Sequence, residues 1–372
     1  MTWQQTDPPA PWDYDKFTWM SQLDDSLAIQ DLSIPGTHDS AAKKGLVGTT
    51  TSERSETQSL TIQEQLNIGV RFLDLRVKIM FESKGLAMYH AGDPVYDPEP
   101  GAGKLDQYYF SAVLKTCYDF LLAHDHETII ISLKSEGDTK YDGSTIEDWF
   151  RKIATDVAAQ LSPSKTFDDM WVVRSDVNAT LHDVRGKMVL WRRFPHEGTD
   201  PTVDYTVPFG LDLTPLNDKY DNTGGAGWLT PVGGYVFVQD AYNEFSASPD
   251  KAALWLNALK GAYDSRCDPA NADANRQYIN FLSIGKFAHF PETYAEVMNP
   301  LMFQWFLALQ QPEPLWNAPR ARSGVGVIPM DFVESGLTER LILMNFSWTY
   351  KSYETQGGRD AWDMLVAKFC TL

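Results

Sequence analysis

Cysteine is scarce in this sequence, which has only Cys117, Cys267 and Cys370 among its 372 residues. Three widely spaced cysteines do not form a disulfide framework, and they lack the paired spacing of a zinc site. Cys117 falls in an apolar stretch with helical spacing, so we expect a buried and unreactive thiol there. The sequence also lacks an apolar run long enough to span a bilayer, which predicts no transmembrane helix.

Positive charge is also in short supply. The chain has 32 Lys and Arg against 50 Asp and Glu, which gives a net charge of -18. Such a surface repels phosphate backbones, so we expect no nucleic acid partner. It offers no polybasic segment for docking on anionic membranes. If the substrate is a lipid, contact with the membrane surface must be transient and use apolar side chains at a rim, or the substrate must come to the enzyme.

The first 20 residues lack the basic-then-apolar pattern of a secretory signal. The chain is therefore either cytoplasmic or a secreted protein from which a signal has been removed. No internal repeat or linker divides the sequence. We expect one catalytic domain over residues 1–372, with a core at about residues 20–350, and a monomer.

Short apolar runs alternate with amphipathic stretches along the chain, which is typical of an α/β fold with parallel strands. Helical spacing predicts helices over 59–67, 110–123, 145–161, 249–262 and 292–309, and the Pro/Gly/Asp-rich residues 200–234 predict a long excursion. The pattern favours a TIM-like (β/α)8 barrel, either distorted or incompletely closed. The eight candidate strands are Leu32–Ile34, Val70–Val77, Leu86–Tyr89, Thr128–Leu133, Lys187–Trp191, Tyr235–Val238, Tyr278–Ser283 and Gly326–Met330.

Seven of these eight runs end in an ionisable residue, and the carboxyl ends of parallel strands meet at one mouth of a barrel. Two histidines there can act as base and acid, arginines bind phosphate oxygens, and an aspartate can orient a histidine. A phosphodiester cleaved by an internal hydroxyl needs this set of groups. The residues at the strand ends are His38 with Asp39, Arg76, His90, Lys134, Arg193, Asp240 and Asp331.

The segment Ile34-Pro-Gly-Thr-His-Asp-Ser40 resembles the first signature of the phosphatidylinositol-specific phospholipase C catalytic domain. The resemblance covers about residues 20–335 and is closest to the small, single-domain bacterial-type enzymes. It implies a TIM-like barrel that cleaves inositol phospholipids. Further matches follow in the same order: Gly69–Arg76, Glu127–Lys134, Arg185–Arg193, Val238–Asp240 with Tyr242, and Tyr278–Phe281.

The resemblance implies a role for each catalytic residue. His38 would be the general base that takes the proton of the inositol 2-hydroxyl, and Asp331 would orient it. Arg76 would bind a non-bridging phosphate oxygen. His90 would be the general acid for the diacylglycerol leaving group, with Asp39 in the same network. The products would be diacylglycerol and a cyclic inositol phosphate.

The resemblance also implies how the head group is held and why no metal or other cofactor is needed. Lys134, Arg193 and Asp240 would bind the inositol hydroxyls, and Tyr242 would stack on the ring. The calcium-dependent eukaryotic relatives carry an acidic ligand where this chain has Arg76, so its guanidinium would replace the ion. Plain and glycosylated phosphatidylinositol both fit this description.

Several alternatives stay open at this point. The family usually has glycine directly after the acid histidine, whereas Ala91 stands here. A metal-dependent phosphodiesterase acting on glycerophosphodiesters or sphingomyelin, and a non-catalytic inositol-lipid-binding module, are the competing functions. His124 and His126 precede a strand, at the opposite mouth, and are expected to be structural. The aromatic residues within 287–294 either form a rim that touches the membrane or belong to the core.

Overall fold

The computed structural model describes residues 15–48, 52–80, 85–99, 106–141, 143–217, 227–229, 235–240, parts of 251–262, 276–285, 290–309 and 324–346. Its strands are β1 Ser33–Thr37, β2 Phe72–Ile79, β3 Leu86–His90, β4 Asp93–Pro94, β5 Ile129–Ser135, β6 Lys140–Tyr141, β7 Ser144–Thr145, β8 Trp171–Val172, β9 Met188–Arg193, β10 Leu211–Asp212, β11 Gly227–Leu229, β12 Tyr235–Gln239, β13 Arg276–Asn280 and β14 Gly326–Met330. Its α-helices are α1 Ile62–Asn67, α2 Phe110–Ala123, α3 Ile146–Leu161, α4 Phe167–Met170, α5 Leu181–Val184, α7 Pro291–Leu309 and α8 Ser335–Leu343, with further helical residues within 251–262. The 3-10 helices are η1 Lys16–Gln22, η2 Ile29–Asp31, η3 Ser52–Arg54, η5 Thr214–Asn217 and η7 Met344–Phe346.

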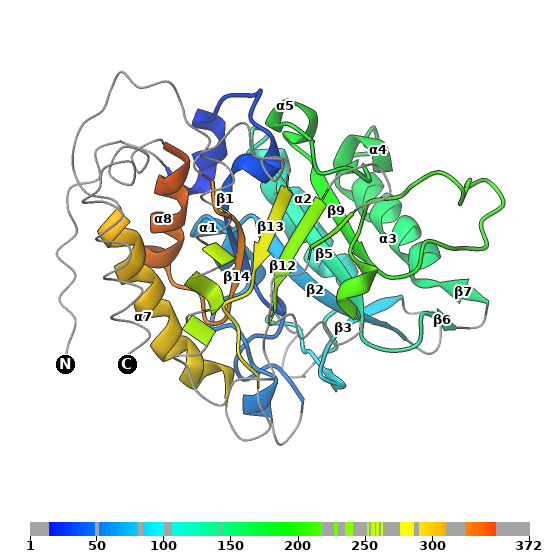
Figure 1. Ribbon diagram of the computed structural model, residues 1–372. Coiled ribbons are helices and arrows are strands. Elements are labelled where there is room, and N and C mark those ends of the chain that lie inside the picture. The colour runs from blue at the N-terminus through cyan, green and yellow to red at the C-terminus, as the bar shows by residue number, and fades with distance from the viewer. Residues whose placement is uncertain are drawn as a thin grey trace.

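The strands form a curled, distorted TIM-like barrel, as the βα alternation predicts (Figure 1). Within the described residues, eight strands run parallel in the order β10-β9-β5-β2-β1-β14-β13-β12, and β11 adds to β12 antiparallel. The first strand in sequence, β1, lies between β2 and the last strand, β14. No pairing within the described residues joins β10 to β11, so the sheet is incompletely closed there.

The prediction of one parallel barrel strand is wrong. The run over Leu86–Tyr89 forms β3, but β3 pairs antiparallel with β2 and places Met88 beside Val77. A parallel pairing needs a crossover of about a dozen residues or more, and only residues 80–85 separate β2 from β3. Two short strands instead pair parallel with β9, namely β8 and β10, and β10 lies inside the segment 200–234 that was expected to be only an excursion.

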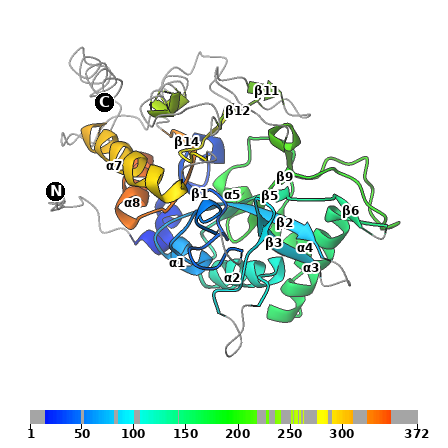
Figure 2. The same cartoon turned by 90° about the horizontal axis from the view of Figure 1, so that it is seen from below.

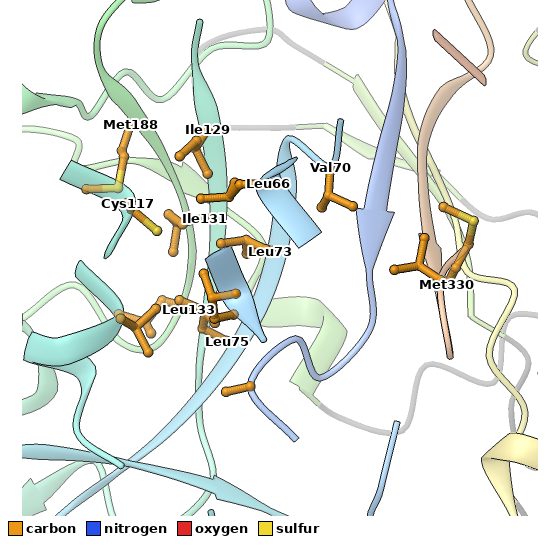
Figure 3. Close-up of a cluster of buried hydrophobic side chains, with 14 of the residues drawn as sticks. Leu66, Val70, Leu73, Leu75, Cys117, Ile129, Ile131, Leu133, Met188 and Met330 are labelled. Carbon is orange, nitrogen blue, oxygen red and sulfur yellow. The ribbon is translucent and has the colours of Figure 1, made fainter. Parts of the chain in front are cut away.

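The parallel strands are buried on both faces because alternate side chains point into the barrel and out toward helices. In β2, Phe72 belongs to the inner cluster of buried residues, and Leu73 belongs to the outer one. In Figure 3 the outer cluster includes Leu66 and Cys117 beside Leu73. Cys117 is a free, buried thiol as expected, and burial raises its pKa to about 12.

The helices pack around the outside of the curled sheet, and Figure 2 shows α1, α2 and α3 along one side of it, with α7 and α8 on another. Sequence spacing predicted α1, α2, α3 and α7 to within about three residues at each end. Helix α3 begins where a capping box forms between Thr145 and Asp148. None of the helices in the described ranges is long and apolar enough to cross a bilayer.

Candidate active site

The predicted residues meet at the carboxyl ends of the parallel strands because of side-chain alternation. Phe72, Asp74 and Arg76 are two residues apart, so all three point into the barrel from β2. The same spacing places Ser132, Lys134 and Glu136 on one side of the chain at β5. The end of the barrel holds a cavity of about 330 Å³, within the range of small-molecule sites. Seven of the nine predicted residues line it, namely His38, Arg76, His90, Lys134, Arg193, Asp240 and Asp331.

His38 has the surroundings of a base. Its Nδ1 lies 2.8 Å from Asp331 Oδ1, so this nitrogen carries the proton. Its Nε2 lies 2.9 Å from Nη2 of Arg76, a donor, and is therefore the acceptor nitrogen. Burial lowers the pKa of His38, but Asp331 and Asp39 outweigh this effect and raise the pKa above the ordinary 6.5. An imidazole with a free Nε2 lone pair can accept a proton.

His90 differs from His38 in what its two ring nitrogens face. Its Nδ1 lies 2.7 Å from the Ser55 carbonyl oxygen, and its Nε2 lies 2.8 Å from Asp39 Oδ2. A neutral imidazole carries only one N–H, so both acceptors are satisfied only when the ring is doubly protonated. The rings of His38 and His90 lie 6.0 Å apart at an interplanar angle of 88°. One ring is thus arranged to accept a proton and its neighbour to donate one.

Asp39 connects the two histidines to Arg76. Its Oδ2 lies 3.1 Å from His38 Nε2 and 2.8 Å from His90 Nε2, and its Oδ1 lies 2.8 Å from Arg76 Nε. Burial alone would raise the pKa of Asp39, but Arg76 and the two histidines hold it well below the usual range. The carboxylate is therefore ionised and stabilises the protonated form of His90. Asp39 itself lies behind the cavity wall and does not line it.

Arg76 is held by a cluster of acidic groups. Besides Asp39, its guanidinium contacts Asp74 at 3.3 Å and Glu136 at 3.4 Å. Asp74 is fully buried and also binds Arg193 at 3.1 Å, so it anchors two arginines from two strands. Burial raises the pKa of Asp74, but these two arginines more than offset that effect. The guanidinium is thereby fixed with one side open to the cavity.

Three residues of this cluster also have ligand atoms close enough together to suggest a metal. His38, Asp39 and Asp74 each offer one possible ligand atom, and these three atoms lie within 4.8 Å of one another. Within the described chain, this is the one group of three residues with such an arrangement. Arg76 nevertheless contacts all three residues, at 2.9, 2.8 and 3.3 Å. A divalent ion bound to those atoms would meet the guanidinium. In this arrangement the arginine supplies the positive charge, and the residues do not fit a metal.

Two further predicted residues, Lys134 and Asp240, line the same cavity. Lys134 binds Glu136 at 3.0 Å, and burial together with Arg76 and Arg193 lowers its pKa. Asp240 lines the cavity at the end of β12. Tyr242 lies outside the described residues, so its predicted stacking role stays a prediction.

Other sequence predictions have mixed outcomes. His124 and His126 lie between α2 and β5, at the amino ends of the strands, as expected. Residues 287–289 of the predicted rim lie outside the described residues. Phe290 is 36% exposed beside the cavity-lining Pro291, but Tyr294 is buried in the core and is not part of a rim.

Sequence reasoning missed three contributors to the cavity and its histidines. Glu136 binds both Arg76 and Lys134, and its spacing from Lys134 could have identified it. Arg54 lines the cavity, and Ser55 supplies the carbonyl that holds His90. No regular strand or helix pattern marks these last two residues.

Comparison with known proteins finds similar lipid-cleaving enzymes. The sequence profile of the phosphatidylinositol-specific phospholipase C X domain matches residues 32–194. The 1-phosphatidylinositol phosphodiesterase of Listeria monocytogenes is 26% identical over 328 residues, which cover 88% of this chain and 84% of that protein. Its counterpart in Staphylococcus aureus (strain Newman) is 27% identical over 292 residues, covering 76% of this chain and 80% of that protein.

Solved structures show the same fold. The phosphatidylinositol-specific phospholipase C of L. monocytogenes superimposes with a TM-score of 0.60 at 24% identity, over 89% of this chain and 99% of that one. The S. aureus enzyme, in a structure concerned with modulation of its membrane binding, gives a TM-score of 0.61 at 21% identity, over 89% of this chain and 98% of that one. Residues 32–194 therefore match the X domain of the phosphatidylinositol-specific phospholipase C family, and the chain is similar to bacterial 1-phosphatidylinositol phosphodiesterases over most of its length and has the fold of the solved bacterial enzymes.

Proposed function

We propose that this protein is a metal-independent phosphatidylinositol-specific phospholipase C that releases diacylglycerol and forms a cyclic inositol phosphate. One observation carries the proposal. Two histidines share the Asp39 carboxylate and flank a fixed guanidinium in a single cavity, and Nε2 of His38 also faces the Arg76 donor. A phosphodiester cleaved by its own neighbouring hydroxyl needs a base, an acid and a cation in this arrangement.

The first half of the reaction uses His38 and Arg76. His38 Nε2 takes the proton of the inositol 2-hydroxyl, and the freed oxygen attacks phosphorus. Asp331 holds the ring and stabilises the cation that forms on it. Arg76 donates to a non-bridging phosphate oxygen as negative charge gathers there. A fixed donor of this kind contributes about 2.7–4 kcal/mol to transition-state stabilisation.

The second half of the reaction uses His90 and Asp39. As the new bond to phosphorus forms, the bond from phosphorus to the glycerol oxygen breaks, and His90 gives that oxygen a proton. His38 ends with an extra proton and His90 with one fewer. The Asp39 carboxylate touches Nε2 of both rings, so it stabilises whichever ring is charged. Exchange with water then restores the starting protonation states.

The two sides of the cavity suit the two ends of the lipid. Lys134, Arg193 and Asp240 line the cavity and offer charged donors and an acceptor to the inositol hydroxyls. Ile284 and Pro291 line the cavity elsewhere, and Phe290 is exposed next to them. This apolar side would accept the glycerol end and touch the lipid surface transiently. Phosphatidylinositol and its glycosylated form share the inositol phosphodiester that this site would bind.

Phosphorus NMR of phosphatidylinositol turnover in the presence of EDTA tests the proposal. We expect the phosphodiester signal to give way to that of a five-membered cyclic phosphate, with full activity in EDTA. His38→Ala should lose this activity, whereas His126→Ala, which changes an exposed histidine between α2 and β5, should keep it.

Each competing function predicts a different result. Loss of activity in EDTA would favour a metal-dependent phosphodiesterase. Binding of the lipid without turnover would favour a non-catalytic module. Full turnover by His38→Ala would refute the assignment of the base.

A further inference from the structure

A short buried segment, Ser55–Gln58, passes beneath the two histidines. It lies between η3 and α1 and contains no helix, yet each of its four side chains is at most 5% exposed. Buried backbone of irregular shape requires partners for its polar groups. The partners of this segment are the loops that carry the proposed catalytic residues.

Gln58 joins the loop of the base to the loop of its orienting carboxylate. Its fully buried amide Nε2 donates to the backbone oxygens of His38 and Met330, each at 2.8 Å. Met330 directly precedes Asp331, whose carboxylate holds His38 Nδ1. The Gln58 Oε1 accepts from the Val333 amide at 3.4 Å, just beyond Asp331. One side chain therefore spans the two loops whose spacing sets the His38–Asp331 contact.

The rest of the segment reaches the other proposed catalytic residues. Thr57 Oγ1 donates to the Asp39 backbone oxygen at 2.9 Å, and the Thr57 oxygen accepts from the Phe332 amide at 2.7 Å. The Ser55 oxygen accepts from His90 Nδ1 at 2.7 Å. The segment thus contacts the loops of base, acid, bridging carboxylate and orienting carboxylate together.

These loops need such support because their backbone is strained. Asp39, Ala91 and Phe332 have φ values of 41°, 52° and 46°, and in the described chain they are the non-glycine residues with positive φ. Each directly follows one of the residues His38, His90 and Asp331. Side chains disfavour this left-handed region, so it persists only where the surroundings hold it.

We propose that Ser55–Gln58 is a positioning element for the acid–base machinery, and that Gln58 is its central residue. The inference rests on the proposed function of the same cavity. Gln58 does not line that cavity, so it acts through His38 and Asp331. Its amide fixes the spacing between their loops, and a change in that spacing alters proton transfer more than substrate binding.

Substitution of Gln58 by methionine, which has a similar shape and no donor, tests the proposal. We expect kcat to fall about 10- to 100-fold with KM nearly unchanged, because displacement of a catalytic group by about 1 Å has effects of that size. The acid limb of the pH profile of kcat/KM should move to lower pH, because a looser contact with Asp331 raises the pKa of His38 less. Gln277→Met is the matched control, because Gln277 is also buried and also donates to a backbone oxygen, that of Tyr278 at 3.0 Å, but lies near the start of β13 and does not line the cavity.

The control separates positioning from general loss of stability. Gln277→Met should also lower the melting temperature, with kcat and the acid limb close to those of the wild type. Wild-type kcat in Gln58→Met, or an equal kcat loss and pH shift in Gln277→Met, would overturn the proposal. If Gln58→Met does not fold, Thr57→Val, which removes the hydroxyl bonds to the Asp39 and Ala42 backbone oxygens, should reduce kcat and leave KM nearly unchanged, and wild-type kcat there would also overturn it.

A second readout does not depend on activity. Imidazole NMR should show His38 titrating at lower pH in Gln58→Met than in the wild type. This comparison holds even if the wild type fails to cleave phosphatidylinositol, a result that would refute the proposed function alone. An unchanged His38 titration in Gln58→Met would refute the positioning role alone.

Discussion

Replacing Arg76 by lysine should lower kcat by about 10²–10³-fold, because one fixed donor to a developing oxyanion contributes about 2.7–4 kcal/mol. The guanidinium contacts Asp39, Asp74, Glu136 and His38 at distances between 2.8 and 3.4 Å. A lysine keeps the charge but has a single nitrogen, so it cannot make this fork and also reach the phosphate. The loss should therefore appear in kcat even though the net charge of the cavity is unchanged.

The same substitution should also cost stability. Asp39 and Asp74 are buried carboxylates, and each loses part of its cationic partner, which costs about 1–3 kcal/mol. Arg192→Lys is the matched control. Arg192 is also buried and also paired with a carboxylate, that of Asp212 at 3.2 Å, but it does not line the cavity.

The assay is steady-state cleavage of phosphatidylinositol in mixed micelles, with melting temperatures measured on the same samples. We expect both variants to melt earlier and only Arg76→Lys to lose kcat strongly. A kcat within tenfold of the wild type in Arg76→Lys would show that the guanidinium does not stabilise the transition state. An equal kcat loss in Arg192→Lys would show that the effect is general destabilisation.

Three further predictions concern the same site. Asp331→Asn should reduce kcat by up to about 10⁴-fold, the effect of the analogous change in serine proteases. Because Asp331 raises the pKa of His38, the acid limb of the pH–rate profile should also move to lower pH, and an unmoved limb would contradict the pairing. Ala91→Gly should keep full activity and stabilise the fold by up to about 1 kcal/mol in denaturant titrations, since Ala91 has a φ of 52°. Dialysis against EDTA should leave turnover unchanged, and recovery of lost activity by added calcium would contradict the role given to Arg76.

The sequence was sufficient to predict the positions that depend on strand alternation. Arg76, Lys134 and Arg193 end parallel strands and face the cavity, because side chains two residues apart share a face and parallel strands end at the same mouth. His38 and Asp331 were expected at the same mouth because parallel strands end there, and the family resemblance implied their pairing. β1 and β14 are indeed neighbours, although the strands lie at opposite ends of the chain.

The sequence was not sufficient where a position depends on the direction of a strand or on irregular backbone. An apolar run does not reveal whether a strand runs parallel or antiparallel, so β3 was placed wrongly. His90 still reaches the cavity, because β3 returns along the end of β2 that carries Arg76. Ser55 and Gln58 were not identified, since their contacts depend on loops with no repeating pattern.

The neighbour relation between β1 and β14 has a consequence for biosynthesis. A ribosome delivers His38, Arg76 and His90 early, but Asp331 and the strand that carries it come about 240 residues after His90. At a rate of about 5–20 residues per second, that interval lasts roughly 10–50 seconds. Until β14 emerges and inserts beside β1, the nascent chain has a histidine base without its orienting partner. Translation order alone would therefore delay the proposed lipase activity until β14 has been synthesised.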